Sequence, residues 1–160
     1  MSRDIAPVPR WAIYTTFALS LIGLALSIYL TNAHFNGTQD LFCSDSGLIN
    51  CAKVTTSAQS YFLGIPVAVL GLCGYVVLCV LNSPWCWRAT SRWVHDARIA
   101  VIVGSMAFVL WLIAAELLII KNICLYCTGV HLVTFLLLIL IVHHSGRRIP
   151  DCEASEHLTS

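Results

Sequence analysis

The stretch that decides the fold is Cys124-Leu125-Tyr126-Cys127, followed directly by TGVHLVTFLLLILIVHH at residues 128–144. No Asp, Glu, Lys or Arg occurs between Asn122 and Gly146. A helix that crosses a bilayer needs about 20 mostly apolar residues, so this segment can hold one. Cysteines three positions apart share a helix face, so both sulfur atoms can meet each other and a common partner. The pair therefore stands where a water-exposed connection enters a lipid-buried helix.

The rest of the chain also has the composition of a membrane protein. Hydrophobic residues make up 58% of the 160 residues and charged residues 11%, with a mean hydropathy of +0.81. In a soluble domain about 25% of residues are charged. Because lipid offers an open backbone no hydrogen-bond partner, the spans are expected to be helices. We predict an all-α membrane protein, a bundle of four transmembrane helices, with spans near Trp11–Thr31, Gly64–Leu81, Arg98–Ile120 and Leu125–His143.

The basic residues predict the orientation of the bundle, since cytosolic loops carry an excess of Lys and Arg. With the N-terminus in the cytosol, only Lys53 and Lys121 lie outside, and the other seven lie inside: Arg3, Arg10, Arg88, Arg92, Arg98, Arg147 and Arg148. We expect a multi-pass protein of the cell membrane with both termini cytosolic. The expected parts are a cytosolic N-terminus (1–10), a membrane domain (11–144) with an extracytoplasmic loop (32–63), and a cytosolic tail (145–160). No basic run suggests nucleic acid, so membrane lipids are the expected surroundings.

This orientation divides the eight cysteines into two groups. Four lie outside the cytosol, where disulfides persist: Cys43, Cys51, Cys124 and Cys127. Two more lie within the second span and are expected to be small buried hydrophobes, and two are cytosolic thiols: Cys73 and Cys79, then Cys86 and Cys152. Four extracytoplasmic cysteines allow three pairings, and their spacing leaves all three open.

Both extracytoplasmic pairs are suited to thiol–disulfide exchange. A helix N-terminus favours thiolate over thiol, because its unpaired N–H groups carry partial positive charge. Cys43 and Cys51 lie in a polar loop, where a static staple would stabilise the fold by about 2–3 kcal/mol. Beside a CxxC motif on the same side of the membrane, we favour the alternative that the loop pair exchanges disulfides with it. Neither pair needs a metal for this chemistry.

Two polar side chains within the spans are candidate site residues. His131 lies one turn beyond Cys127 on the same helix face, where it can contact a bound acceptor, or else bond to a neighbouring helix. Glu116 lies five residues before Lys121, near the outer end of its span. It is either an interfacial residue near that lysine or a group that delivers protons.

The arrangement of these motifs resembles vitamin K epoxide reductase and its bacterial homologues. A loop cysteine pair comes first, then Cys51-x2-Val54-x2-Ser57-x6-Gly64-Ile65-Pro66, then CxxC at the start of the last of four helices. The resemblance covers about Trp11 to His144. DsbB, a functional analogue with four helices, carries its two pairs in the opposite order.

The resemblance implies a role for each cysteine. In this family the position of Cys127 reacts with a quinone, and the position of Cys124 exchanges with that of Cys51. The position of Cys43 meets the thiols of a soluble partner. Ser57 is expected on a short amphipathic helix that caps the bundle, and Ser57, His131 and Glu116 are the candidate quinone-binding residues. Gly64–Pro66 is expected to open the second span, with proline at an early helical position.

The resemblance also implies the reaction and its partners. Vertebrate enzymes have Tyr where this chain has His131, which favours plain reduction of menaquinone or ubiquinone over vitamin K epoxide. No thioredoxin-like domain is fused to these 160 residues, so a separate DsbA-like protein of the thioredoxin fold is the expected partner. The predicted function is to reoxidise that protein, which supports disulfide bond formation. The alternatives are a vitamin K epoxide or quinone reductase of the endoplasmic reticulum, a Cys₄ zinc scaffold, and a structural bundle with static disulfides.

Overall fold

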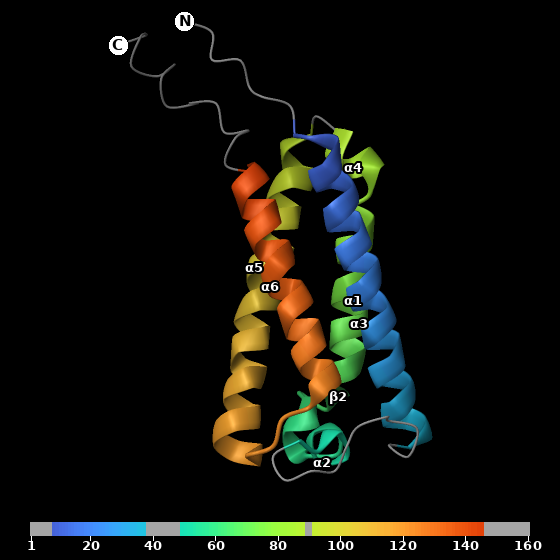
Figure 1. Cartoon of the computed structure of the whole chain (residues 1–160), viewed down its shortest axis with the longest axis vertical. Coiled ribbons are helices and arrows are strands. Elements are labelled where there is room, and N and C mark those ends of the chain that lie inside the picture. The colour runs from blue at the N-terminus through green and yellow to red at the C-terminus, as the bar shows by residue number, and fades with distance from the viewer. Residues whose placement is uncertain (1–7, 38–48, 89–90, 146–160) are drawn as a thin grey trace, which may run out of the picture.

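Four apolar helices form the body of the protein (Figure 1). The computed structural model describes residues 8–37, 49–88 and 91–145. Its long elements are α1 (Arg10–Asn36), α3 (Val67–Leu81), α5 (Arg92–Ala114) and α6 (Leu125–Ser145). Helices α1 and α5 each pack against both α3 and α6, which closes the bundle around a central core. Within these described residues, three helices are long and apolar enough to cross a membrane and α3 is a shorter apolar one, so the predicted all-α bundle of about four spans is confirmed.

Small residues along one face of α1 let the helices approach closely. This face is buried and runs through Ala12, Thr16, Ser20, Gly23, Ser27, Leu30 and Ala33. In a lipid bilayer the hydrophobic effect does not drive helices together. Close packing of helix backbones over small side chains is therefore a main source of helix association. The hydroxyl groups of Thr16 and Ser20 donate to the carbonyls of Ala12 and Thr16, at 2.9 and 2.8 Å. These polar side chains are therefore satisfied within their own helix.

A short helix covers one end of the bundle, as predicted (Figure 1). Asn50 is the N-cap of helix α2 (Cys51–Thr55), and its side-chain oxygen accepts a hydrogen bond from the backbone N–H of Lys53 at 2.8 Å. Its buried residues are Cys51, Val54 and Thr55, spaced along one face, while Lys53 is exposed. The helix is therefore amphipathic. A 3₁₀ turn, η2 (Ala58–Ser60), follows it, so the expectation that Ser57 lies on the capping helix is wrong: Ser57 joins the two.

The entry into the second span differs from the prediction. Residues Tyr61–Phe62 (β1) and Ile65–Pro66 (β2) form a two-stranded antiparallel hairpin, and α3 begins only at Val67. Leu63 and Gly64 at the turn have φ angles of 52° and 82°. Both values are incompatible with a right-handed helix, and glycine adopts such values at little cost. Gly64 is therefore a turn residue, and Pro66 is the residue before the helix rather than an early helical position.

The ends of the other spans also differ from the sequence prediction. Helix α1 continues five residues beyond Thr31 to Asn36, and α5 begins at Arg92 rather than at Arg98. A short helix, α4 (Pro84–Arg88), precedes α5. The last turn of the third span is π-helical, η3 (Ala115–Ile120). A single π turn within an otherwise α-helical segment changes which side chains face the bundle, and such turns are frequent at functional sites.

One side-chain expectation is wrong. Cys73 is exposed on the outside of the bundle rather than buried, so in a membrane it faces lipid. At the α4 end of the bundle Trp87 is buried, and the guanidinium carbon of Arg98 lies 3.8 Å from the centre of its ring. Arg98 is itself buried and donates from Nε and Nη2 to the carbonyl of Leu81, at 3.0 and 2.6 Å. This charge therefore ties the end of α3 to α5.

Candidate active site

A backbone contact joins the first loop to the connection before α6. Ile49 and Ile123 form a parallel bridge, and the N–H of Asn50 donates to the carbonyl of Ile123 at 3.2 Å. Cys51 is the residue after Asn50 in the loop segment, and Cys124 is the residue after Ile123 in the connection before α6. The two segments that carry the predicted exchange partners therefore run side by side.

Cys51 and Cys124 belong to one cluster of buried side chains. The cluster consists of Leu30, Ala33, Cys51, Val54 and Cys124, and both cysteines are fully buried. Cys51 is disulfide-bonded, whereas Cys124 and Cys127 are free thiols. Cys43 and Cys152 lie outside the described residues, so the structure says nothing of their positions.

The environment of Cys124 stabilises its thiolate. The side chain of Cys127 donates a hydrogen bond to it, and this lowers the pKa of the Cys124 thiol below its usual range. Burial opposes the shift, and the backbone N–H of Cys127, 3.3 Å from the sulfur, supports it. Hydrogen bonds to a charged form favour that form. The neighbouring thiol of Cys127 is therefore the main cause of the lowered pKa, and the predicted effect of the helix N-terminus stays a prediction.

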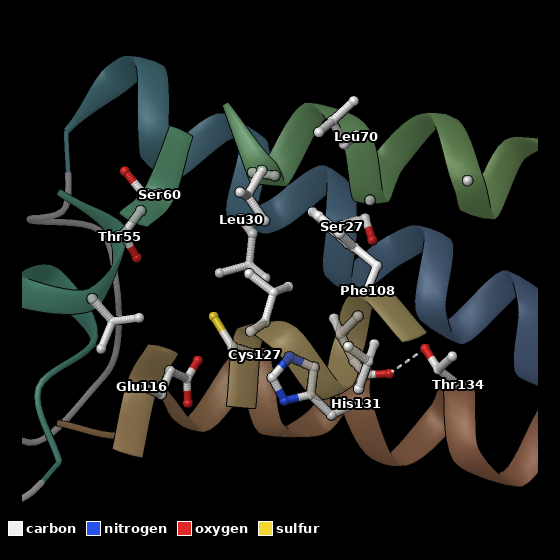
Figure 2. Close-up of a pocket in the computed structure, with 18 of the residues that line it drawn as sticks. Ser27, Leu30, Thr55, Ser60, Leu70, Phe108, Glu116, Cys127, His131 and Thr134 are labelled. Carbon is white, nitrogen blue, oxygen red and sulfur yellow. Dashed lines mark hydrogen bonds between the residues drawn. The ribbon is translucent and has the colours of Figure 1, made fainter. Parts of the chain in front are cut away.

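A cavity opens inside the bundle directly beside the second cysteine (Figure 2). It has a volume of about 150 Å³ and is walled by α1, α2, α3, α5, η3 and α6. Most of its lining is apolar. The titratable side chains on its wall are Cys127, His131, Glu116, Tyr75 and His34. A largely apolar hollow with a few convergent polar groups is the usual form of a small-molecule site.

Three predicted site residues lie together along one wall of this cavity, as Figure 2 shows for Glu116, Cys127 and His131. Glu116 and His131 are each 7% exposed. Figure 2 shows the carboxyl group of Glu116 pointing along this wall toward Cys127. The structure describes no ion pair between Glu116 and Lys121, and Lys121 is exposed. The Glu116 side chain is therefore buried on the cavity wall and is not paired with that lysine.

The remaining predicted residue, Ser57, also lines the cavity, at the α2 end. Its hydroxyl group donates to the carbonyl of Val54 at 2.8 Å, so it holds the turn after α2. Tyr75 and Thr134 also line the cavity and were not predicted from the sequence. The hydroxyl of Tyr75 lies 2.9 Å from Oγ1 of Thr134 and 3.1 Å from the carbonyl oxygen of Val130. In the sequence they stand out only as a tyrosine and a threonine within apolar spans. This signal is weak, because both residue types occur often in membrane helices.

The sequence profile of the vitamin K epoxide reductase family matches residues 14–142. The chain belongs to this family. The match includes all of α3 and α5, most of α1 and α6, and both segments joined by the Ile49–Ile123 bridge. Membership makes this protein a membrane oxidoreductase whose chemistry concerns disulfides and quinones. In this member the CxxC pair separates a buried contact with the Cys51 helix from an internal cavity.

Proposed function

We propose that this protein oxidises a soluble DsbA-like partner in the extracytoplasmic space and passes the electrons to a quinone. The electrons travel from the partner to Cys43 and Cys51, and then to Cys124 and Cys127. The expected surroundings are the cell membrane, with both termini in the cytosol and the four cysteines outside it. The proposed orientation follows from the positive-inside distribution of arginines.

The proposal rests on the different surroundings of the two cysteines of the CxxC pair. Cys124 is buried in the same cluster as Cys51, while Cys127 lies on the wall of the cavity. The two cysteines adjoin each other, since the N–H of Cys127 lies 3.3 Å from the sulfur of Cys124. One pair therefore contacts both an outer disulfide residue and a site inside the bundle.

The cavity suits the ring of a quinone. Its apolar walls accept a planar ring, and His131 can donate to a carbonyl oxygen of that ring. A second hollow is lined by Phe62, Leu63, Ile65, Leu70, Gly104, Ser105 and Phe108. Three of these residues, Leu70, Ser105 and Phe108, also line the first cavity. The connected apolar surface between α3, α5 and the hairpin offers a place for an isoprenoid tail.

The cysteines act in two exchange steps. A thiolate of the partner attacks the Cys43–Cys51 disulfide, and the partner leaves as its own disulfide once Cys43 and Cys51 are reduced. Cys51 then attacks Cys124 of the inner disulfide, which releases Cys127 as a thiolate. Cys43 attacks Cys51 in turn, which restores the outer disulfide and releases Cys124. The structure has Cys51 bonded and the inner thiols free, as expected at the end of this sequence.

The reduced inner pair then faces the cavity. A bound quinone supplies the sink for two electrons, and these come from Cys124 and Cys127 as a bond forms between their sulfur atoms. The lowered pKa of Cys124 assists the preceding step, because a thiol of lower pKa leaves a mixed disulfide faster. The apolar packing around both cysteines limits access of water and competing thiols.

The test is single-turnover reduction of menaquinone or ubiquinone by the purified protein, driven by a reduced DsbA-like partner. We expect Cys→Ala at Cys43, Cys51, Cys124 or Cys127 to abolish oxidation of the partner. The matched controls are the free cysteines elsewhere in the bundle, Cys73, Cys79 and Cys86. Alanine at these positions should leave the rate within about twofold of wild type, since surface and peripheral substitutions change little.

Two results would contradict the proposal. Full activity in Cys127→Ala would remove the cavity-facing cysteine from the path. Retention of one stoichiometric zinc ion by the four thiolates, measured by metal analysis, would favour a Cys₄ scaffold. The same assay with vitamin K epoxide in place of quinone distinguishes epoxide reduction from quinone reduction.

A further inference from the structure

We propose that Glu116 is a catalytic residue of the inner cysteine pair: it takes the proton of the Cys127 thiol and passes it toward the cavity. This inference rests on the proposed function, because it assigns a proton path to the same redox step. The sequence left open whether Glu116 is a bystander at the membrane interface. The structure supplies three observations about its surroundings.

The first observation is the position of Glu116 on the wall that carries the reacting group. Glu116 and Cys127 line the same cavity, and Figure 2 shows the carboxyl group pointing along that wall toward Cys127. A general base has to reach the proton that it removes, and catalytic hydrogen bonds often tighten only when the substrate is bound. The wall that carries Cys127 therefore also carries a group that can accept its proton.

The second observation is that the carboxyl group is both buried and on the cavity wall. Glu116 is 7% exposed and lines the cavity together with Cys127 and His131. A charged group within a membrane span is costly, and carboxylates at such places commonly belong to proton relays. Lys121 is exposed and makes no ion pair with Glu116 in the structure. Among the described residues, no cation pairs with this carboxyl group, which shares the cavity wall with Cys127 and His131.

The third observation is the local backbone. Glu116 lies on the π turn η3, which begins at Ala115 and ends before Lys121. Lys121 has a left-handed backbone, with φ of 55°. The turn interrupts regular α-helical geometry at the place where Glu116 meets the cysteines, and backbone irregularity of this kind is frequent at functional sites.

The step balances as follows. Oxidation of two thiols to a disulfide releases two protons and two electrons, and reduction of a quinone to a quinol takes up two of each. Glu116 accepts the proton of Cys127 as its sulfur bonds to the sulfur of Cys124. The protonated carboxyl then gives that proton to an oxygen atom of the acceptor in the cavity. Because Cys124 reacts as a thiolate, its own proton has already left to water, and the quinol takes its second proton from water.

The first experiment measures single-turnover quinone reduction by the reduced protein, together with quinone binding at equilibrium. Glu116→Gln keeps the size of the side chain and removes its ability to accept a proton. We expect the rate to fall by about 100-fold or more, within the range for loss of a general base, and the dissociation constant for quinone to change less than threefold. Glu116→Asp should retain an intermediate rate, and it also tests the proposal if the glutamine variant does not fold. Asp96→Asn, an exposed charge at the other end of α5, is the matched control and should match wild type.

The second experiment uses no quinone. Infrared difference spectra between the chemically oxidised and reduced protein report whether a carboxyl group changes protonation when the CxxC pair changes its state. We expect a carboxyl band in wild type and Asp96→Asn that is absent in Glu116→Gln. A glutamine variant that reduces quinone within threefold of the wild-type rate, or a wild-type spectrum without a carboxyl band, would overturn the assignment. If wild type itself reduces no quinone while the band is present, the proposed acceptor is wrong and the proton contact stands.

Discussion

Gly23 of α1 leaves room for the ring of Tyr75 of α3, because a Cβ atom at position 23 would lie 1.9 Å from Cε1 of that ring. The hydroxyl group of Tyr75 reaches across the bundle to Thr134 and Val130 on α6. Because Gly23 has no side chain, Tyr75 can connect α3 with α6 at the cavity wall.

We therefore expect Gly23→Ala to displace Tyr75 and to weaken the bundle. Overpacking of a well-packed core costs about 1–3 kcal/mol. Since Tyr75 lines the cavity, quinone affinity should fall as well. The measurements are reversible unfolding in detergent and quinone binding. Gly129→Ala on α6 is the control, since its Cβ would lie 3.5 Å from Leu26 in ordinary contact. Equal stability of the two variants would show that the tyrosine can move without loss.

The exchange between the outer and inner pairs predicts a trapped intermediate. In the double variant Cys43→Ala/Cys127→Ala, the resolving cysteine of each pair is absent, so Cys51 and Cys124 should remain joined after mild oxidation. Their common buried cluster and the adjacent backbone bridge place them for this bond. Peptide mapping under non-reducing conditions identifies it. A product that joins Cys51 or Cys124 to Cys73 or Cys79 instead would contradict the proposed order of exchange.

The sequence predicted the membrane bundle well, because composition and length alone decide which segments cross lipid. It located helix ends less well. The residues before Val67 are apolar enough to continue a helix, but the positive φ angles of Leu63 and Gly64 depend on pairing within the hairpin. Cys73 was misplaced because an apolar span has no polar face to show which side meets the bundle and which meets lipid.

The site was predictable where motif spacing is local and unpredictable where it depends on tertiary contact. Cys127 and His131, one turn apart on α6, indeed share the cavity wall. The neighbourhood of Glu116 could not be predicted from the sequence, because it depends on the π turn and on the tertiary packing that places η3 on the cavity wall. Tyr75 lies on another helix, and only the small size of Gly23 brings it to the cavity.

The lowered pKa of Cys124 predicts how its titration responds to substitution of its neighbour. The side chain of Cys127 is the main cause of the shift, so Cys127→Ala should move deprotonation of Cys124 to higher pH. Cys127→Ser keeps a hydrogen-bond donor and should preserve most of the shift. Since the folded-state pKa is lowered, the linked stability is fully present above the unfolded-state pKa and is lost as pH falls through the folded-state value. Thiolate absorbance during pH titration measures the effect, in a background without the other free cysteines. Titration curves of the alanine and serine variants that both coincide with the wild-type curve would assign the shift to the backbone instead.

Arg98 should stabilise the opposite end of the bundle without acting in electron transfer. Its guanidinium group donates twice to the carbonyl of Leu81 and covers the ring of Trp87. Arg98→Leu leaves that buried carbonyl without these donors, which costs about 1–3 kcal/mol for an unsatisfied group. Arg98→Lys should recover only part of the loss, because an ammonium group lacks the planar fork and stacks less well on an aromatic ring. Unfolding in detergent gives the stability difference, and the exposed Arg88→Leu on α4 is the control. Quinone reduction per folded molecule should remain that of wild type in all three variants, and a selective loss of turnover in Arg98→Lys would show that this end of the bundle influences the redox site.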